Sequence, residues 1–196
     1  MKAAITALLR HPLTMAVKSA LRDLKWSLKP GVPANPPIPA QVKSVVFVCL
    51  GNICRSPFAR ELAALRLAET GHGTIAVGSA GIRTTQAKRS PAEACEAGAA
   101  YGVQLNAHVP EQLTMQMMHD SDMVVVMDAG QFAQLRLSYP NHRDRIFLLA
   151  AFDGARNGAY ARYNIADPFG QPLEAFEHCY ARIARALDQL LPLIRA

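Results

Sequence analysis

Apolar residues change their spacing several times between residue 43 and the C-terminus. Four short runs rich in β-branched and aliphatic residues predict strands, over 43–48, 74–81, 123–127 and 145–149. The first run shows no alternation of apolar and polar residues, so we expect that strand to be buried on both faces. Segments with apolar residues at helical spacing separate the runs, so strands and helices alternate along the chain.

The segments between the strands predict helices over 58–69, 91–101, 111–118, 129–137 and 173–194. Residues 103–110 predict an irregular segment, and residues 151–170, with three glycines and one proline, predict a long loop. Strands that alternate with helices indicate the α/β class, in which right-handed crossovers place helices on both faces of a parallel sheet. Such a sheet binds its ligands at the carboxyl ends of the strands.

The first 42 residues have a different character. Apolar residues recur at helical spacing over 1–27, and Pro12 is expected to kink or split this helix. A surface anchor for anionic lipid and a docking helix for a partner are both open. A helix folded onto its own domain, a frayed tail and translation that begins at Met15 are equally open. A segment with five prolines follows and predicts a semi-extended linker. We therefore expect a basic amphipathic extension, a linker and a folded domain, over 1–28, 29–42 and 43–196.

Charge is distributed unevenly along the 196 residues. The net charge is +6, from 21 Lys and Arg against 15 Asp and Glu. Residues 1–42 hold six of the basic residues and one of the acidic ones, so the rest of the chain is close to neutral. A composition of 51% hydrophobic and 18% charged residues is ordinary for a globular domain. The basic balance therefore belongs to the extension, and we expect no nucleic-acid partner.

The four cysteines show no C-x-x-C pairing of the kind that binds zinc. The apolar stretch 3–9 is too short for a secretory signal, and no stretch approaches the roughly 20 apolar residues of a membrane-spanning helix. We expect a cytoplasmic protein, peripheral to the membrane if residues 1–28 anchor it. A reducing compartment would also keep a catalytic thiol free.

The candidate chemistry lies in one loop, between the strand that ends near Cys49 and the helix that follows Pro57. Backbone N–H groups and a helix N-terminus converge at such a junction, which suits an oxyanion. These donors would favour a thiolate at Cys49, and the planar guanidinium of Arg55 can hold two phosphate oxygens. The spacing alone is weak evidence, because Cys54 and Cys179 also precede an arginine by six positions, in helical stretches. A buried cysteine beside a surface arginine is the alternative.

The sequence from Val48 to Pro57, Val-Cys-Leu-Gly-Asn-Ile-Cys-Arg-Ser-Pro, resembles the phosphate-binding loop of the low-molecular-weight protein tyrosine phosphatases. The resemblance extends from about Val45 to the C-terminus. It implies a Rossmann-like sheet of four strands in the order 2-1-3-4. It also implies hydrolysis of phosphotyrosine esters through a phosphocysteine intermediate, with no cofactor and no metal. The implied substrate is a phosphotyrosine protein, such as a bacterial tyrosine kinase of polysaccharide export.

The resemblance also implies roles for individual residues. Cys49 is the nucleophile, Arg55 is the phosphate clamp, and Asp167, in the chain's one Asp-Pro pair, is the general acid and base. From the sequence alone Asp167 is as compatible with an ordinary turn. The loop residues implied to bind phosphate are Leu50, Gly51, Asn52, Ile53, Cys54, Arg55 and Ser56, and Phe169 is expected to wall the slot for the phenyl ring.

Finer expectations concern the support of the loop. Asn52 is expected to hold its left-handed turn through side-chain hydrogen bonds, one of them with Ser79, and the Ser56 hydroxyl to bond the Cys49 sulfur. Cys54 is open between a reversible disulfide with Cys49, as in the family, and a small buried residue. We assign no histidine to catalysis and expect His108 to be structural or exposed.

The sequence departs from the family in the loop 82–89, where members commonly place an aromatic residue. Here the loop has none and carries three basic residues, which leaves an acidic peptide or another phosphoester open as substrate. Two other functions compete. A thiol-dependent arsenate reductase needs further cysteines after the third strand, and residues 127–132 contain none. A non-catalytic phospho-binding module is disfavoured by the intact set of Cys49, Arg55 and Asp167.

Overall fold

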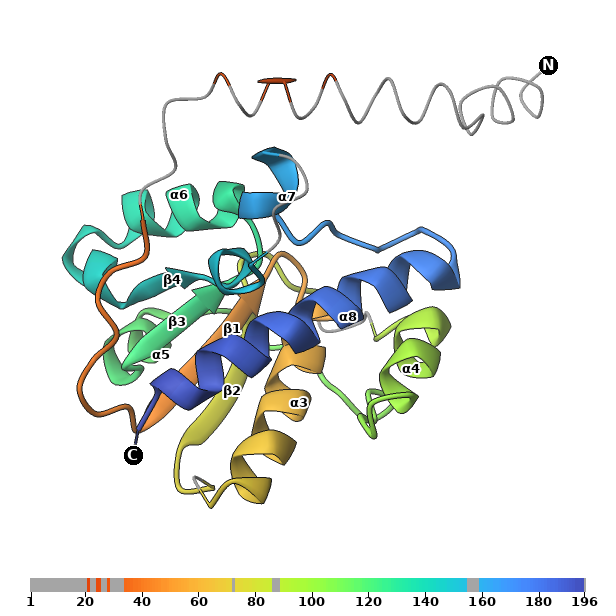
Figure 1. Ribbon diagram of the computed structural model, residues 1–196, viewed down its shortest axis with the longest axis horizontal. Helices are drawn as coiled ribbons and strands as arrows, with labels where there is room; N and C mark the ends of the chain where they lie inside the picture. Colours follow the sequence, from red (N-terminus) through yellow and green to blue (C-terminus); the bar gives the residue numbers. More distant parts are fainter. Residues whose placement is uncertain are drawn as a thin grey trace.

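Four parallel strands form the centre of the molecule in the computed structural model (Figure 1). It describes residues 34–71, 73–85, 89–154 and 159–195, together with Leu21, Leu24, Lys25 and Leu28. The expected helix over 1–27 and the start of the linker lie almost wholly outside the described residues. The strands are β1 (Ser44–Cys49), β2 (Ala76–Gly81), β3 (Met123–Val126) and β4 (Ile146–Leu148).

The sheet has the order β2-β1-β3-β4, as expected from the family resemblance. All three pairings are parallel, with Phe47 of β1 opposite Ser79 on one side and Val125 on the other. The chain leaves β1 to one side, forms β2, and then crosses to the other side to form β3. The carboxyl end of β1 is therefore the point where the connections diverge, and parallel sheets bind ligands at such a point.

Helices cover the sheet on both faces (Figure 1). The helix α8 crosses in front of the strands beside α3, and the short helix α5 lies behind them. The helix α4 packs against α8, while α6 packs on β4 and β3. The helices are α3 (Arg55–Glu69), α4 (Ala92–Ala99), α5 (Met115–Asp120), α6 (Ala129–Ser138), α7 (Ala159–Tyr163) and α8 (Leu173–Leu190).

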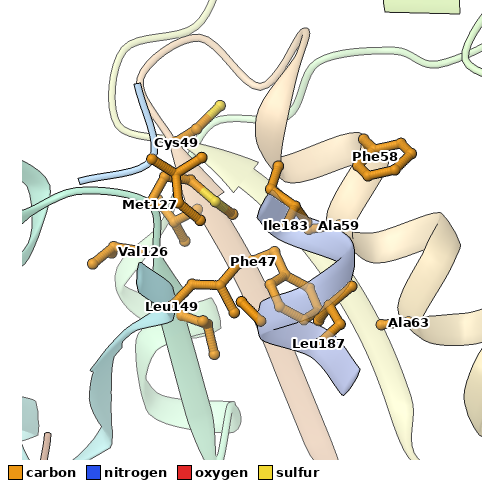
Figure 2. Packing of buried hydrophobic residues seen from close by; sticks show 14 of the residues in the cluster. Phe47, Cys49, Phe58, Ala59, Ala63, Val126, Met127, Leu149, Ile183 and Leu187 are labelled. Carbon is orange, nitrogen blue, oxygen red and sulfur yellow. The ribbon is translucent and has the colours of Figure 1, made fainter. Parts of the chain in front are cut away.

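Phe47 carries the packing between β1 and α8. Its ring lies among Ile183 and Leu187 in Figure 2, and all three side chains are fully buried. Cys49 stands at the end of the same cluster, and its sulfur points away from the packed side chains (Figure 2). Burial of these apolar groups therefore fixes the strand that ends at the cysteine.

A second apolar contact fixes the helix that follows the cysteine loop. The Phe58 ring of α3 stacks on Tyr180 of α8 with centroids 3.8 Å apart. The Tyr180 hydroxyl donates to the Cys54 carbonyl oxygen at 3.1 Å, so its one polar atom is satisfied although the ring is fully buried. Packing against α8 therefore fixes both the strand before the loop and the helix after it.

The structure corrects several of the element boundaries expected from sequence. The helix α3 begins at Arg55, three residues before the predicted start. The helix α5 begins at Met115 instead of residue 111. Gln112 and Leu113 first pair with Gly81, through a bridge and a 2.8 Å hydrogen bond from the Leu113 N–H, and Thr114 then caps the helix. The segment predicted as a loop over 151–170 contains α7, and the last helix ends at Leu190, four residues early.

Part of the proline-rich segment packs against the domain. The Asn35 side chain accepts a hydrogen bond from the Leu148 N–H at 2.7 Å and donates to the Leu148 carbonyl oxygen at 3.1 Å. Val42 is fully buried, and its N–H donates to Arg195. Within the described residues, no helix has both the length and the hydropathy needed to cross a bilayer.

Candidate active site

The loop between β1 and α3 is built around Asn52. Its φ of 53° lies in the left-handed region, which asparagine tolerates better than most residues. The side-chain amide donates to Ser56 at 2.8 Å and, as expected, to Ser79 at 3.0 Å. The amide oxygen accepts from the Glu111 N–H at 2.9 Å. One buried side chain therefore joins the loop to α3, to β2 and to the segment before α5.

The Cys49 sulfur lies beneath this loop and accepts two hydrogen bonds. The donors are the Asn52 N–H at 3.2 Å and the Ser56 hydroxyl, as expected, at 3.1 Å. Cys49 is a free cysteine and is 3% exposed. Both donors stabilise negative charge on the sulfur more than they stabilise a neutral thiol. The arrangement suits a thiolate held in one fixed direction.

Backbone N–H groups of the loop are available to an anion. The N–H groups of Gly51, Ile53 and Cys54 donate to no acceptor within the described ranges. The first N–H groups of α3 add to them, because an α-helix leaves its first donors without internal partners. Donors that converge at a helix N-terminus favour a phosphate-like oxyanion.

Arg55 begins α3 and is 2% exposed. Its Nη1 donates to Asp128 at 3.1 Å and to the Ile165 carbonyl oxygen at 3.1 Å, and its Nη2 donates to Asp167 at 2.6 Å. Burial alone would lower the Arg55 pKa, but the negative charges of Cys49, Asp167 and Asp128 outweigh it, so the pKa is raised. Nε is buried and has no hydrogen-bond partner among the described residues. A buried donor of this kind is costly to leave unpaired and would match a phosphate oxygen.

A cavity of about 270 Å³ opens above the sulfur. This volume is near the lower end of ligand pockets (roughly 300–1,000 Å³), so it suits one inserted side chain better than a large ligand. Phe169 lines it with a half-exposed ring. The lining residues are Cys49, Leu50, Gly51, Ile53, Cys54, Arg83, Thr85, Asp167 and Phe169. The structure thus places nearly all of the predicted site residues around one cavity, with Asn52, Arg55 and Ser56 in hydrogen-bond contact with its lining.

Cys54 is buried and free, and it forms no disulfide with Cys49 in this structure. Burial, followed by the nearby Cys49, raises the pKa of the Cys54 thiol above its ordinary value. Burial also raises the pKa of Cys179, to about 12. Both groups are therefore neutral thiols at pH 7.

The role of Asp128 and the contact of His108 were not predicted from the sequence. Asp128 follows β3, caps α6 by accepting from the Gln131 N–H at 2.9 Å, and pairs with Arg55. Its position directly after a buried strand was the available signal. His108 lies 2.8 Å from the Asn52 carbonyl oxygen through Nε2, in a segment with no regular pattern. Burial lowers the His108 pKa, with Arg60 and Arg89 adding to the effect. Its structural role agrees with the expectation that it is not catalytic.

A cysteine sulfur that accepts two hydrogen bonds, converging N–H groups and a buried arginine are typical of the class of phosphatases that use a cysteine nucleophile. The profile of a family described as low molecular weight phosphotyrosine protein phosphatase matches residues 44–196. A probable low molecular weight protein-tyrosine-phosphatase, EpsP of Ralstonia nicotianae, is 34% identical over 155 residues, which cover 79% of this chain and 98% of the relative. The chain belongs to the low molecular weight protein tyrosine phosphatases, and it is a phosphatase.

Solved structures agree with this assignment. The tyrosine phosphatase AmsI of Erwinia amylovora superposes with a TM-score of 0.69 at 29% identity, covering 80% of this chain and 96% of AmsI. The YwlE arginine phosphatase of Geobacillus stearothermophilus superposes with a TM-score of 0.65 at 26% identity, covering 76% and 91%. Solved structures with this fold are therefore named both as a tyrosine phosphatase and as an arginine phosphatase.

Proposed function

We propose that this phosphatase hydrolyses phosphotyrosine in proteins, with Cys49 as nucleophile, Arg55 as phosphate clamp and Asp167 as general acid and base. The proposal rests on two features of the same site. The Cys49 sulfur accepts two hydrogen bonds, and the buried Nε of Arg55 has no hydrogen-bond partner among the described residues. A nucleophile and an unused donor for the equatorial oxygens are what phosphoryl transfer requires.

In the first step the Cys49 thiolate attacks phosphorus in line with the tyrosyl oxygen. The S–P bond forms as the P–O bond to the leaving group breaks. The N–H groups of Gly51, Ile53 and Cys54, with Leu50, Asn52 and Ser56 completing the loop, bind the equatorial oxygens together with Arg55. Protonated Asp167 gives its proton to the leaving phenolate, and the aromatic ring of Phe169 walls the slot for the departing tyrosine.

In the second step Asp167, now a carboxylate, takes a proton from a water molecule that attacks phosphorus. The S–P bond breaks, inorganic phosphate leaves and the thiolate returns. The Ser56 hydroxyl, 3.1 Å from the sulfur, stabilises the departing thiolate. No step requires a metal ion, because Arg55 and the N–H groups carry the charge of the oxygens.

The pair of Asp167 and Arg55 changes partners during this cycle. Asp167 is held by Nη2 at 2.6 Å in the structure. A phosphate that uses Nη2 as well as Nε displaces the carboxylate from the arginine, and Asp167 is then free to face the leaving oxygen. Substrate binding thus releases Asp167 for its proposed role as the acid.

A phosphotyrosine protein is the substrate that we propose, and a bacterial tyrosine kinase of polysaccharide export is the specific example implied by the family resemblance. We also propose the division into a basic extension over 1–28, a linker over 29–42 and the catalytic domain over 43–196. In this division the extension is the part that contacts a partner or a membrane surface in the cytoplasm. Cosedimentation of the full chain and of 43–196 with anionic vesicles tests the membrane contact, and equal sedimentation of the two rules it out.

Hydrolysis of p-nitrophenyl phosphate in the presence of a chelator tests the catalytic proposal. Cys49→Ser should lower kcat by about 10³-fold or more, because a serine hydroxyl is a far weaker nucleophile than a thiolate at pH 7. Cys95→Ser is the matched control, since Cys95 lies on α4 away from the cavity lining. Equal turnover by the wild type and Cys49→Ser would exclude a cysteine mechanism.

A further inference from the structure

The loop after β2 lies directly beside the cysteine loop. Its Ile82 N–H donates to the Cys49 carbonyl oxygen at 2.9 Å, and its Arg83 N–H donates to the Leu50 carbonyl oxygen at 2.8 Å. Arg83 is therefore attached by its own backbone to the residue that follows the nucleophile. Its side chain is exposed and lines the cavity together with Thr85.

A second set of contacts braces this loop from the other side. The Gln112 side chain accepts from the N–H and the hydroxyl of Thr84, both at 3.0 Å, and donates to the Ile82 carbonyl oxygen at 2.8 Å. A Cβ atom at Gly81 would lie 2.5 Å from the Thr84 side chain and 3.0 Å from Gly51. The two loops meet so closely that only glycine fits between them. Residues 82–85 therefore have a fixed position at the mouth of the cavity.

The charges at the mouth are not balanced. Asp167 is the one acidic residue of the lining, and its carboxylate is paired with Arg55. Within the described residues, the guanidinium of Arg83 makes no ion pair. A planar guanidinium offers two parallel donors that match a carboxylate. The rim of the cavity thus presents a positioned, unused site for an anion beyond the one that holds the phosphate.

We propose that Arg83 binds a carboxylate of an acidic residue close to the phosphotyrosine in the substrate protein. The proposal rests on the proposed function, since it requires the phosphotyrosine ring to fill the cavity and the flanking peptide to cross its rim. Residues 82–89 contain no aromatic side chain, so charge is what this edge of the cavity offers to a flanking peptide. The same guanidinium disfavours a cationic group of the substrate protein at the mouth.

The test compares two phosphotyrosine peptides that differ only in having Glu or Gln on both sides of the phosphotyrosine. The wild type should hydrolyse the Glu peptide with the higher kcat/KM. Arg83→Gln should lower kcat/KM for the Glu peptide by about fivefold, the upper range for one exposed ion pair, and leave the Gln peptide unchanged. Arg83→Glu should reverse the preference. Added salt should reduce the preference of the wild type, because the pair is exposed.

Lys43→Gln is the matched control, because it removes one exposed positive charge at the amino end of β1, the opposite end from Cys49. It should leave the peptide preference intact. Hydrolysis of p-nitrophenyl phosphate, which has no flanking group, should be unchanged in Lys43→Gln, and it serves to normalise the peptide values of the two Arg83 variants. A wild type with no preference for the Glu peptide, or an Arg83→Gln loss that is equal for both peptides, overturns the proposal alone. A wild type that does not hydrolyse p-nitrophenyl phosphate overturns the proposed function as well.

Discussion

The two segments that meet at the cavity are held in very different ways. The loop between β1 and α3 is fixed by hydrogen bonds from several elements, with Asn52 at its centre and the Ser79 side chain, the Glu111 N–H and the His108 side chain around it. Asp167 lies on the connection from β4 to α8 with 42% of its side chain exposed. Its carboxylate meets Arg55 at 2.6 Å and its own neighbour, the Phe169 N–H, at 3.3 Å.

The connection that carries Asp167, the proposed acid, is held most firmly at residues that precede Asp167 in the chain. Arg182 of α8 pairs with buried Asp153 at 2.7 Å and donates to the carbonyl oxygens of Asn164 and Ala161. Beyond Ile165 the segment reaches the site mainly through the contacts of Asp167. The difference indicates that the Cys49 loop is preorganised, whereas the position of Asp167, the proposed acid, depends on its contact with Arg55.

Arg55→Lys should have the largest effect, because it disturbs both segments. Lysine cannot reproduce the planar fork, so the contacts to Asp128, Asp167 and phosphate cannot all be kept. We expect kcat/KM for p-nitrophenyl phosphate to fall by about 10³-fold, the scale for loss of a group that stabilises transition-state charge. Steady-state kinetics measure this, and a loss below tenfold would show that the N–H groups bind phosphate without the arginine.

Asp167→Asn should affect the contribution of the second segment while leaving the Cys49 loop intact. Turnover should fall by about 10²-fold, because the amide cannot donate a proton to the leaving oxygen. Inorganic phosphate should bind at least as tightly as in the wild type, since Arg55 Nη2 loses its carboxylate competitor. Kinetics with aryl phosphates of increasing leaving-group pKa provide the measurement, and the loss should grow along this series. Unchanged turnover would remove Asp167 from the mechanism.

Asn52→Ala should weaken the preorganised loop alone. It leaves the Glu111 N–H without its acceptor and forces alanine into a backbone with φ of 53°. We expect a loss of about 2–3 kcal/mol in the free energy of unfolding, from one buried unsatisfied group and the strained backbone. Urea denaturation measures this loss, and Asn35→Ala, remote from the site, is the comparison. Full stability with full activity would mean that the loop holds its shape without the amide.

The smallest effect concerns pH and His108. Burial lowers the His108 pKa below its value in the unfolded chain, so the unfolded state binds more protons between the two values. The stability contribution is therefore complete above the unfolded pKa of about 6.5 and is lost as pH falls through the lowered folded value. His108→Gln should show a weaker decrease in unfolding free energy between pH 7.5 and pH 5 than the wild type. Parallel decreases in both proteins would contradict this assignment.

Local patterns in the sequence were sufficient to predict the loop. Cys49, Arg55 and the Ser56-Pro57 helix start are neighbours in the chain, and the strand order followed from the family resemblance. Asp128 and the partner of His108 were not predicted, because the contacts to Arg55 and Asn52 span 73 and 56 residues, a separation that no local pattern encodes. The late start of α5 has the same origin. Residues with acceptable helix propensity, Gln112 and Leu113, are drawn into pairing with Gly81 by tertiary contacts.

The Asn35 contact has a consequence for handling the protein. β4 is the last strand of the sheet on its side, and such a strand presents backbone groups to which a second chain can add. At this edge the Asn35 amide forms hydrogen bonds with the N–H and the carbonyl oxygen of Leu148, as a neighbouring strand would. A shortened chain that starts at residue 43 exposes them. It should self-associate more readily than one that starts at residue 34, with the same catalytic rate per folded molecule.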